Sequence, residues 1–146
     1  MQTADHVLVP LLDGQHSLAQ IARIEDGRAL LYITRTVSNP KAQTKPLSAP
    51  QVVAVLCVDV SAVPVDDWPV LGYDAVPRLR LFHERSLATM DLTDPTLIEA
   101  FANAVHGLYP WDGFPDKNLF TRMLLNPEER PYASRMTADF PTSESP

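Results

Sequence analysis

Short hydrophobic runs separated by turn residues fill the first part of the chain. Two Asp-Gly pairs divide three of these runs, which lie at residues 7–12, 18–24 and 29–34. Asp-Gly between β-rich runs is a strong hairpin signal, because both central positions of a type I′ turn need positive φ. The spacing of Asp13-Gly14 and Asp26-Gly27 therefore predicts a three-stranded antiparallel meander over residues 6–36.

The next hydrophobic run extends from Val52 to Val60 without alternation. Such a run is typical of a central strand covered on both faces. It contains Cys57, the single cysteine, which is expected to be a buried core thiol. Residues 38–50 hold three prolines and predict a loop, whereas further strands are predicted through residues 70–73 and 80–83.

Helical spacing appears only in the second part of the chain. Asp94-Pro95 supplies an N-cap and a proline at the first helical position, and Gly107 suits the helix end. Hydrophobic residues recur between them at Leu97, Phe101, Ala104, Val105 and Leu108. A second, shorter helix is predicted between Asp116 and Asn126.

Together these elements predict an α+β fold that is mostly β. The expected architecture is a small bent antiparallel sheet or barrel of five or six strands with one or two C-terminal helices. The length of 146 residues suits one compact domain, which is expected over residues 1–136. The polar stretch at residues 137–146 is expected to be a flexible tail.

The charge narrows the classes of partner. The chain has 12 basic and 18 acidic residues and a net charge of -6. General attraction to nucleic acid or to anionic membranes requires basic surface, so neither is expected as a partner. Simple solvation is the commoner explanation of such a charge. The N-terminus lacks signal-peptide features and the lone cysteine has no partner for a disulfide, so the cytoplasm is the expected location.

Motifs for catalysis, metals and cofactors are absent. The four histidines, His6, His16, His83 and His106, lack the short spacing of metal ligands, and no second histidine follows His83-Glu84 as a zincin helix would require. The chain has no phosphate-binding glycine loop, no Rossmann fingerprint and no nucleophile elbow. We therefore expect no enzyme activity, no metal and no cofactor.

Two acidic stretches contain aromatic residues and no Lys or Arg, at residues 48–77 and 86–116. Aromatic anchors beside charged rims are typical of protein interfaces. The residues predicted to contact a partner are Asp66, Asp67, Trp68, Tyr73, Asp74, Trp111, Asp112, Phe114 and Asp116. Two alternatives stay open. Trp68 can instead be a core residue, and the segment 108–116 can instead fold back to cover the sheet.

A family resemblance rests on three pieces of sequence. They are Val9-Pro10-Leu11-Leu12-Asp13-Gly14, then Ala19-Gln20-Ile21, and after an apolar strand Asp67-Trp68-Pro69-Val70-Leu71-Gly72. Over about residues 6–85 the chain resembles bacterial immunity proteins of polymorphic toxin systems, the group catalogued as immunity protein 26. The resemblance implies a cytoplasmic protein that binds and neutralises a cognate secreted toxin and has no catalytic activity of its own.

Acidic residues suit a toxin with a basic active-site surface, which they could occlude. The free protein is expected to be a monomer or a weak dimer. Two other functions remain as alternatives: a non-enzymatic adaptor or protein-interaction module unrelated to toxins, and a small hydrolase or nuclease. The second of these predicts a pocket in which histidines and acids converge.

Overall fold

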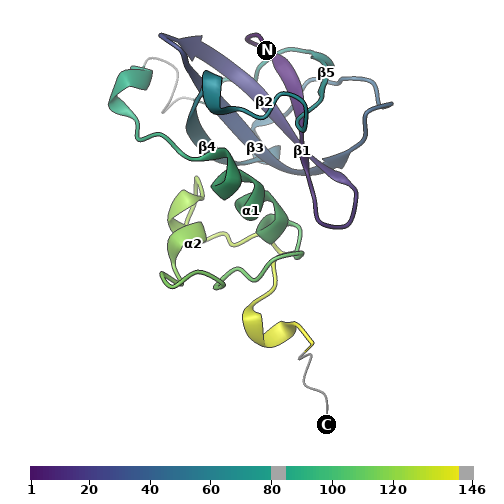
Figure 1. Ribbon diagram of the computed structural model, residues 1–146, viewed down its shortest axis with the longest axis vertical. Helices are drawn as coiled ribbons and strands as arrows, with labels where there is room; N and C mark the ends of the chain where they lie inside the picture. The colour runs from purple at the N-terminus through teal and green to yellow at the C-terminus, as the bar shows by residue number, and fades with distance from the viewer. Residues whose placement is uncertain (80–84, 142–146) are drawn as a thin grey trace.

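Five β-strands form one antiparallel sheet in the computed structural model, which describes residues 1–79 and 85–141 (Figure 1). Their order across the sheet is β4-β3-β2-β1-β5. The strands are β1 (Asp5–Pro10), β2 (His16–Glu25), β3 (Arg28–Ser38), β4 (Val52–Asp59) and β5 (Val70–Tyr73), and the helices are α1 (Pro95–Val105) and α2 (Leu119–Met123). The predicted mostly-β class with C-terminal helices is confirmed, and the sheet is open because β4 and β5 lie at opposite edges.

The predicted meander is formed by β1, β2 and β3, but its two Asp-Gly pairs make different turns. Asp26 and Gly27 both have positive φ, at 50° and 77°, as the two-residue hairpin requires. In the first hairpin only Gly14 has positive φ, and the longer loop closes through the Leu11 N–H, which donates to the Gln15 carbonyl at 2.9 Å. Asp-Gly therefore occurs in a two-residue turn in one hairpin and in a longer loop in the other.

Both faces of the sheet are buried over the inner parts of β1, β2, β3 and β4. Alternate residues of the strands, among them Val7, Ile21 and Leu31, pack toward the helices. On the opposite face Tyr32 and Cys57 pack with Leu87, which lies beyond the strands, so Cys57 is the core thiol that the sequence predicts. Because both faces are covered, the inner parts of the strands have continuous rather than alternating hydrophobic sequences.

The prediction that residues 52–60 form a central strand is wrong, since β4 lies at one edge of the sheet. Its outer side is shielded by later segments of the chain. The Thr93 N–H donates to the Cys57 carbonyl at 2.7 Å, and the Leu125 N–H donates to the Val53 carbonyl at 2.9 Å. Burial of both faces gives an edge strand the same sequence pattern as a central one.

Helix α1 lies under the sheet and begins and ends as predicted (Figure 1). The Asp94 carboxylate caps it by accepting from the Thr96 N–H at 2.8 Å, and Pro95 occupies its first turn. Beyond α1, Gly107 turns the chain with a φ of 76°. The predicted second helix is the short helix α2, whose Phe120 is buried.

The segment that follows α1 folds back over the core. Trp111 is 2% exposed, and its ring lies 5.5 Å from Phe120 and 5.8 Å from Phe101, measured between centroids. Phe114 packs edge-on to Phe120 at 5.2 Å. Of the two alternatives for residues 108–116, covering the core is the one that the structure supports.

The chain remains attached beyond residue 136. The backbone N–H and the hydroxyl of Thr137 both donate to the Asp112 carboxylate, at 2.7 and 2.8 Å, and Thr137–Asp139 forms a short 3₁₀ helix. The predicted tail is therefore anchored in its first part. The predicted strand at residues 80–83 and the remainder of the tail, residues 142–146, lie outside the described residues.

A row of buried polar side chains crosses β1, β2 and β3 on the face of the sheet away from α1. His6 pairs with Gln20, and Gln20 pairs with Tyr32. The Gln20 amide donates to the carbonyls of Ala4 and Asp74, at 3.1 and 3.0 Å. His6 is 1% exposed, and neither ring nitrogen has a hydrogen-bond partner among the described residues. Burial lowers the pKa of His6, although Asp74 and Asp5 offset part of this effect.

Acidification from about pH 7.5 to about pH 5.5 is therefore expected to destabilise the protein. The unfolded chain binds protons more readily than buried His6, so the stability present above the ordinary histidine pKa of 6.5 is lost as the pH falls below it. His106, whose pKa is also lowered by burial, acts in the same direction. Urea unfolding at the two pH values measures the loss, and His6→Gln should reduce it. An unchanged pH dependence in that variant would contradict the role of His6.

Candidate functional site

The turn that leads into β5 is fixed by a buried tryptophan. The N–H groups of Asp67 and Trp68 both donate to the Pro64 carbonyl, at 2.9 and 3.0 Å. Trp68 is 1% exposed, and its indole N–H donates to the Glu99 carboxylate of α1 at 2.9 Å. The structure therefore supports the core alternative for Trp68, and the ring is not available as a surface anchor.

Residues on either side of Trp68 are turned outward. Asp66 and Asp67 are exposed, and so are three hydrophobic side chains: Val65 at 61%, Val70 at 48% and Tyr73 at 76%. In the sheet Val70 pairs with Val7 and Tyr73 with Asp5, so the two side chains belong to the same side of the sheet as α1. We call Val65, Asp66, Asp67, Val70 and Tyr73 the β5 surface.

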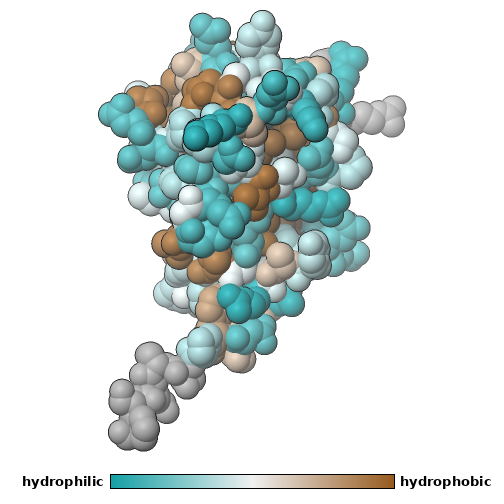
Figure 2. Space-filling view, turned by 90° about the vertical axis from the view of Figure 1, so that its right-hand side faces the viewer, coloured by the Kyte–Doolittle hydropathy of each residue, from teal (hydrophilic) through white to brown (hydrophobic). Residues whose placement is uncertain are grey.

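The β5 surface combines exposed hydrophobic groups with carboxylates. In the view from the side on which β5 lies in Figure 1, hydrophobic patches are separated by hydrophilic side chains (Figure 2). Asp74 lies beside this surface but is half-buried, and its carboxylate accepts from the Ala75 N–H at 2.8 Å. Of the residues predicted to contact a partner in the first acidic stretch, Asp66, Asp67 and Tyr73 are exposed.

Fewer hydrogen bonds from other segments reach the outer edge of β5 than that of β4 within the described residues. At β5 the Tyr73 carbonyl accepts from the Thr44 hydroxyl at 3.1 Å. By contrast, backbone N–H groups from two later segments cover β4. An exposed strand edge with hydrophobic side chains is a common site for partner binding.

The second acidic stretch has a structural role. The Trp111 indole donates to the Thr121 hydroxyl at 3.0 Å, and Phe114 is half-buried in the aromatic cluster. Hydrogen bonds from Thr137 lower the pKa of Asp112, and the hydrogen bond from Arg122 lowers that of Asp116. In Figure 1 residues 108–116 lie below α1, away from β5, so the structure does not bring the aromatic residues of the two stretches into one surface.

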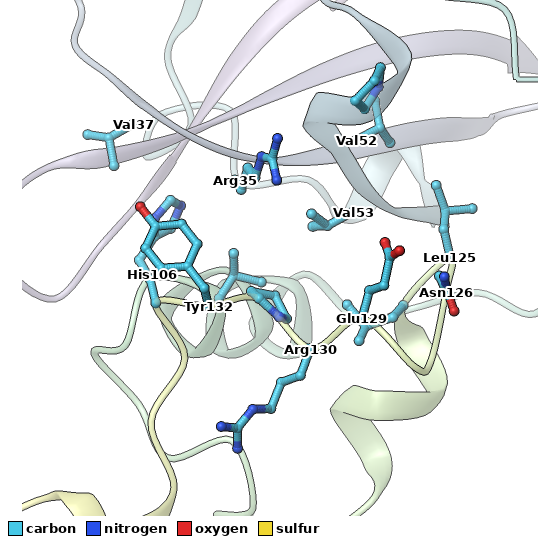
Figure 3. A pocket seen from close by; sticks show the side chains of 15 residues that line it. Arg35, Val37, Val52, Val53, His106, Leu125, Asn126, Glu129, Arg130 and Tyr132 are labelled. Carbon is cyan, nitrogen blue, oxygen red and sulfur yellow. The ribbon is translucent and has the colours of Figure 1, made fainter.

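A cleft that sequence reasoning missed lies between the ends of β3 and β4 and the segment at residues 124–133 (Figure 3). Its volume is about 600 Å³. The polar side chains that line it are Arg35, His106, Asn126, Glu129, Arg130 and Tyr132. They come from three separate parts of the chain and share no spacing, so no local pattern could have revealed them.

This cleft is the feature relevant to the hydrolase alternative. His106 and Glu129 both line it, but they lie on different sides of it (Figure 3). The Nε2 atom of His106 is 3.0 Å from the Ser17 hydroxyl, and Ser17 is itself buried. In residues 1–79 and 85–141 no three His, Cys, Asp or Glu side chains are grouped to hold a metal ion.

Helices in the described part of the chain are too short to cross a membrane. Comparisons of the chain with protein-family models, with curated proteins and with solved structures found no match.

Proposed function

We propose that this protein is an immunity protein that binds and neutralises a cognate bacterial toxin through the β5 surface. The observation that carries the proposal is the arrangement around Trp68. A buried ring fixes the turn, while Asp66, Asp67, Val70 and Tyr73 remain exposed beside an accessible strand edge. The sequence resemblance to immunity protein 26 supports the same function.

The chemistry of the β5 surface fits a basic partner. Tyrosine and valine side chains supply hydrophobic contact area at low conformational cost, and rim carboxylates speed the approach of a positively charged surface. Many toxins that act on nucleic acids bind phosphates through basic groups, so carboxylates can occupy the same position. Neutralisation then requires binding alone and no catalytic group in this chain.

Co-purification with the product of the adjacent gene tests the proposal directly. A tight complex, together with rescue of growth when that product is expressed in the same strain, is the expected result. Absence of a complex and absence of toxicity would overturn it and favour the adaptor alternative. Capture of a stable housekeeping partner from a strain without toxin genes would also favour the adaptor.

Reversing the charge at Asp66 and Asp67 together to lysine is expected to slow association with the toxin roughly tenfold at low salt, because rim charges act mainly on the association rate. Stopped-flow or biosensor kinetics at two salt concentrations measure the effect. Both carboxylates are exposed, so the free energy of unfolding should change little.

The matched control is the pair Asp91→Lys and Glu128→Lys. These acids are also exposed, lie away from the β5 surface in sequence, and give the same change in net charge. If the control pair slows association as much as the Asp66 and Asp67 pair does, net charge is responsible and the β5 surface is not the binding site.

A further inference from the structure

The cleft between the sheet and residues 124–133 lies far from the β5 surface. It opens at the ends of β3 and β4, whereas β5 lies at the opposite edge of the sheet. A partner bound to β5 therefore leaves the cleft free. Its volume of about 600 Å³ is typical of small-molecule sites.

The cleft has a hydrophobic lining. Val52, Val53, Val105 and Leu124 form part of its wall. Three other hydrophobic side chains that line it are exposed: Leu125 at 37%, Val37 at 43% and Tyr132 at 94%. Covering these groups with an apolar ligand would remove them from water, which is the main source of affinity in such sites.

Arg35 is the polar group best placed to orient a ligand. It projects from β3 between Val37 and Val53 (Figure 3). Within the part of the chain that the structure describes, its guanidinium forms no ion pair or hydrogen bond. Arginine binds carboxylates through two parallel hydrogen bonds, so an unpaired arginine beside hydrophobic groups suits an anionic, partly apolar ligand.

Two further charged side chains, Glu129 and Arg130, line the cleft. The Glu129 side chain extends toward the strands on the far side of the cleft from His106, whereas the Arg130 side chain points away from the other labelled residues (Figure 3). Arg35 and Glu129 are not within ion-pair distance of each other. Glu129 should therefore repel an anion that Arg35 attracts, and Arg130 should have little effect.

We propose that this cleft binds a ligand in which an apolar group carries a single carboxylate. The carboxylate contacts Arg35, and the apolar group packs against Val53, Val105 and Leu124. Two sources share this chemistry: a free apolar acid, and the C-terminal residue of a peptide. The proposal is independent of toxin binding at β5.

Binding can be measured by titration of ¹⁵N-labelled protein with four probes. Octanoate and octanamide represent the free ligand. A short peptide ending in leucine, with a free or an amidated C-terminus, represents the peptide. The expected result is that at least one carboxylate shifts the amide signals of residues 35–37, 53, 105–106, 124–126, 128–130 and 132, while its amide counterpart binds more weakly. The source is read from which carboxylate binds more tightly.

Three single substitutions separate the roles of the charges. Arg35→Gln is expected to weaken carboxylate binding roughly ten- to hundredfold, the range for a lost hydrogen bond to a charged group. Glu129→Gln is expected to strengthen it, and Arg130→Gln, which changes the charge as Arg35→Gln does, should leave it nearly unchanged. All three side chains are exposed, so the fold should survive, as thermal unfolding can check.

Several results would overturn the proposal. One is that no probe shifts the cleft signals, or that the shifts fall elsewhere. Another is that amides bind as tightly as carboxylates, which would leave Arg35 without a role. A third is that Arg35→Gln and Arg130→Gln weaken binding equally, since only general electrostatics would then be at work.

Discussion

Replacing Trp68 with alanine is expected to lower the free energy of unfolding by about 3–5 kcal/mol, the usual range for a buried large aromatic. The ring is 1% exposed and belongs to the core between the sheet and α1. Its removal leaves a cavity and takes away the hydrogen bond to Glu99. Urea unfolding followed by circular dichroism measures the loss.

Two milder variants separate the contribution of the ring's volume from that of its hydrogen bond to Glu99. Trp68→Phe keeps most of the hydrophobic volume but removes the indole N–H, so it should cost less than the alanine variant. Glu99→Gln keeps an oxygen that accepts the same hydrogen bond and should cost least. Near-wild-type stability of Trp68→Ala would contradict the buried position of the ring and return it to the surface.

Gly107→Ala is expected to destabilise the protein by about 2–5 kcal/mol, through backbone strain and steric overlap together. Gly107 has a φ of 76°, which residues with a Cβ adopt only at a cost. A Cβ there would lie 2.4 Å from the Ala133 carbonyl oxygen, which is backbone and cannot move aside as a side chain can. The segment at residue 133 would therefore have to shift away from the end of α1.

Gly14→Ala is the matched control for this prediction. Gly14 has a similar φ of 85°, but a Cβ there would meet nothing within 4 Å. Its substitution should cost about 1–2 kcal/mol from the backbone conformation alone. The difference in unfolding free energy between the two variants measures the contribution of the close packing of residue 133 against Gly107. Equal losses in both would show that this packing does not contribute.

Local signals in the sequence explain which parts of the fold could be predicted. The Asp-Gly pairs and the Asp94-Pro95 cap act within a few residues, and the meander and α1 are where these signals place them. The position of β4 in the sheet depends on residues 93 and 125, which are far away in the sequence. The hydrophobic composition of β4 itself indicates only that both of its faces are covered.

The same distinction applies to the candidate sites. The segment around Trp68 was visible in the sequence as aromatics among acids, but composition cannot say which aromatic points inward. In the structure Trp68 is buried and donates a hydrogen bond to Glu99, whereas Tyr73 is exposed at the edge of the sheet. The cleft was invisible, because Arg35, His106 and Glu129 meet only through the tertiary fold.

The edge of β5 also bears on how copies of the protein behave toward one another in solution. Unpaired strand edges invite pairing between identical chains, which leads to aggregation. Here β5 is only four residues long, its register against β1 shifts between His6 and Val7, and Thr44 occupies the Tyr73 carbonyl. Asp66 and Asp67 would add like-charge repulsion if two copies approached edge to edge. The carboxylates that we propose attract a basic partner would thus also help to keep free copies of the protein apart.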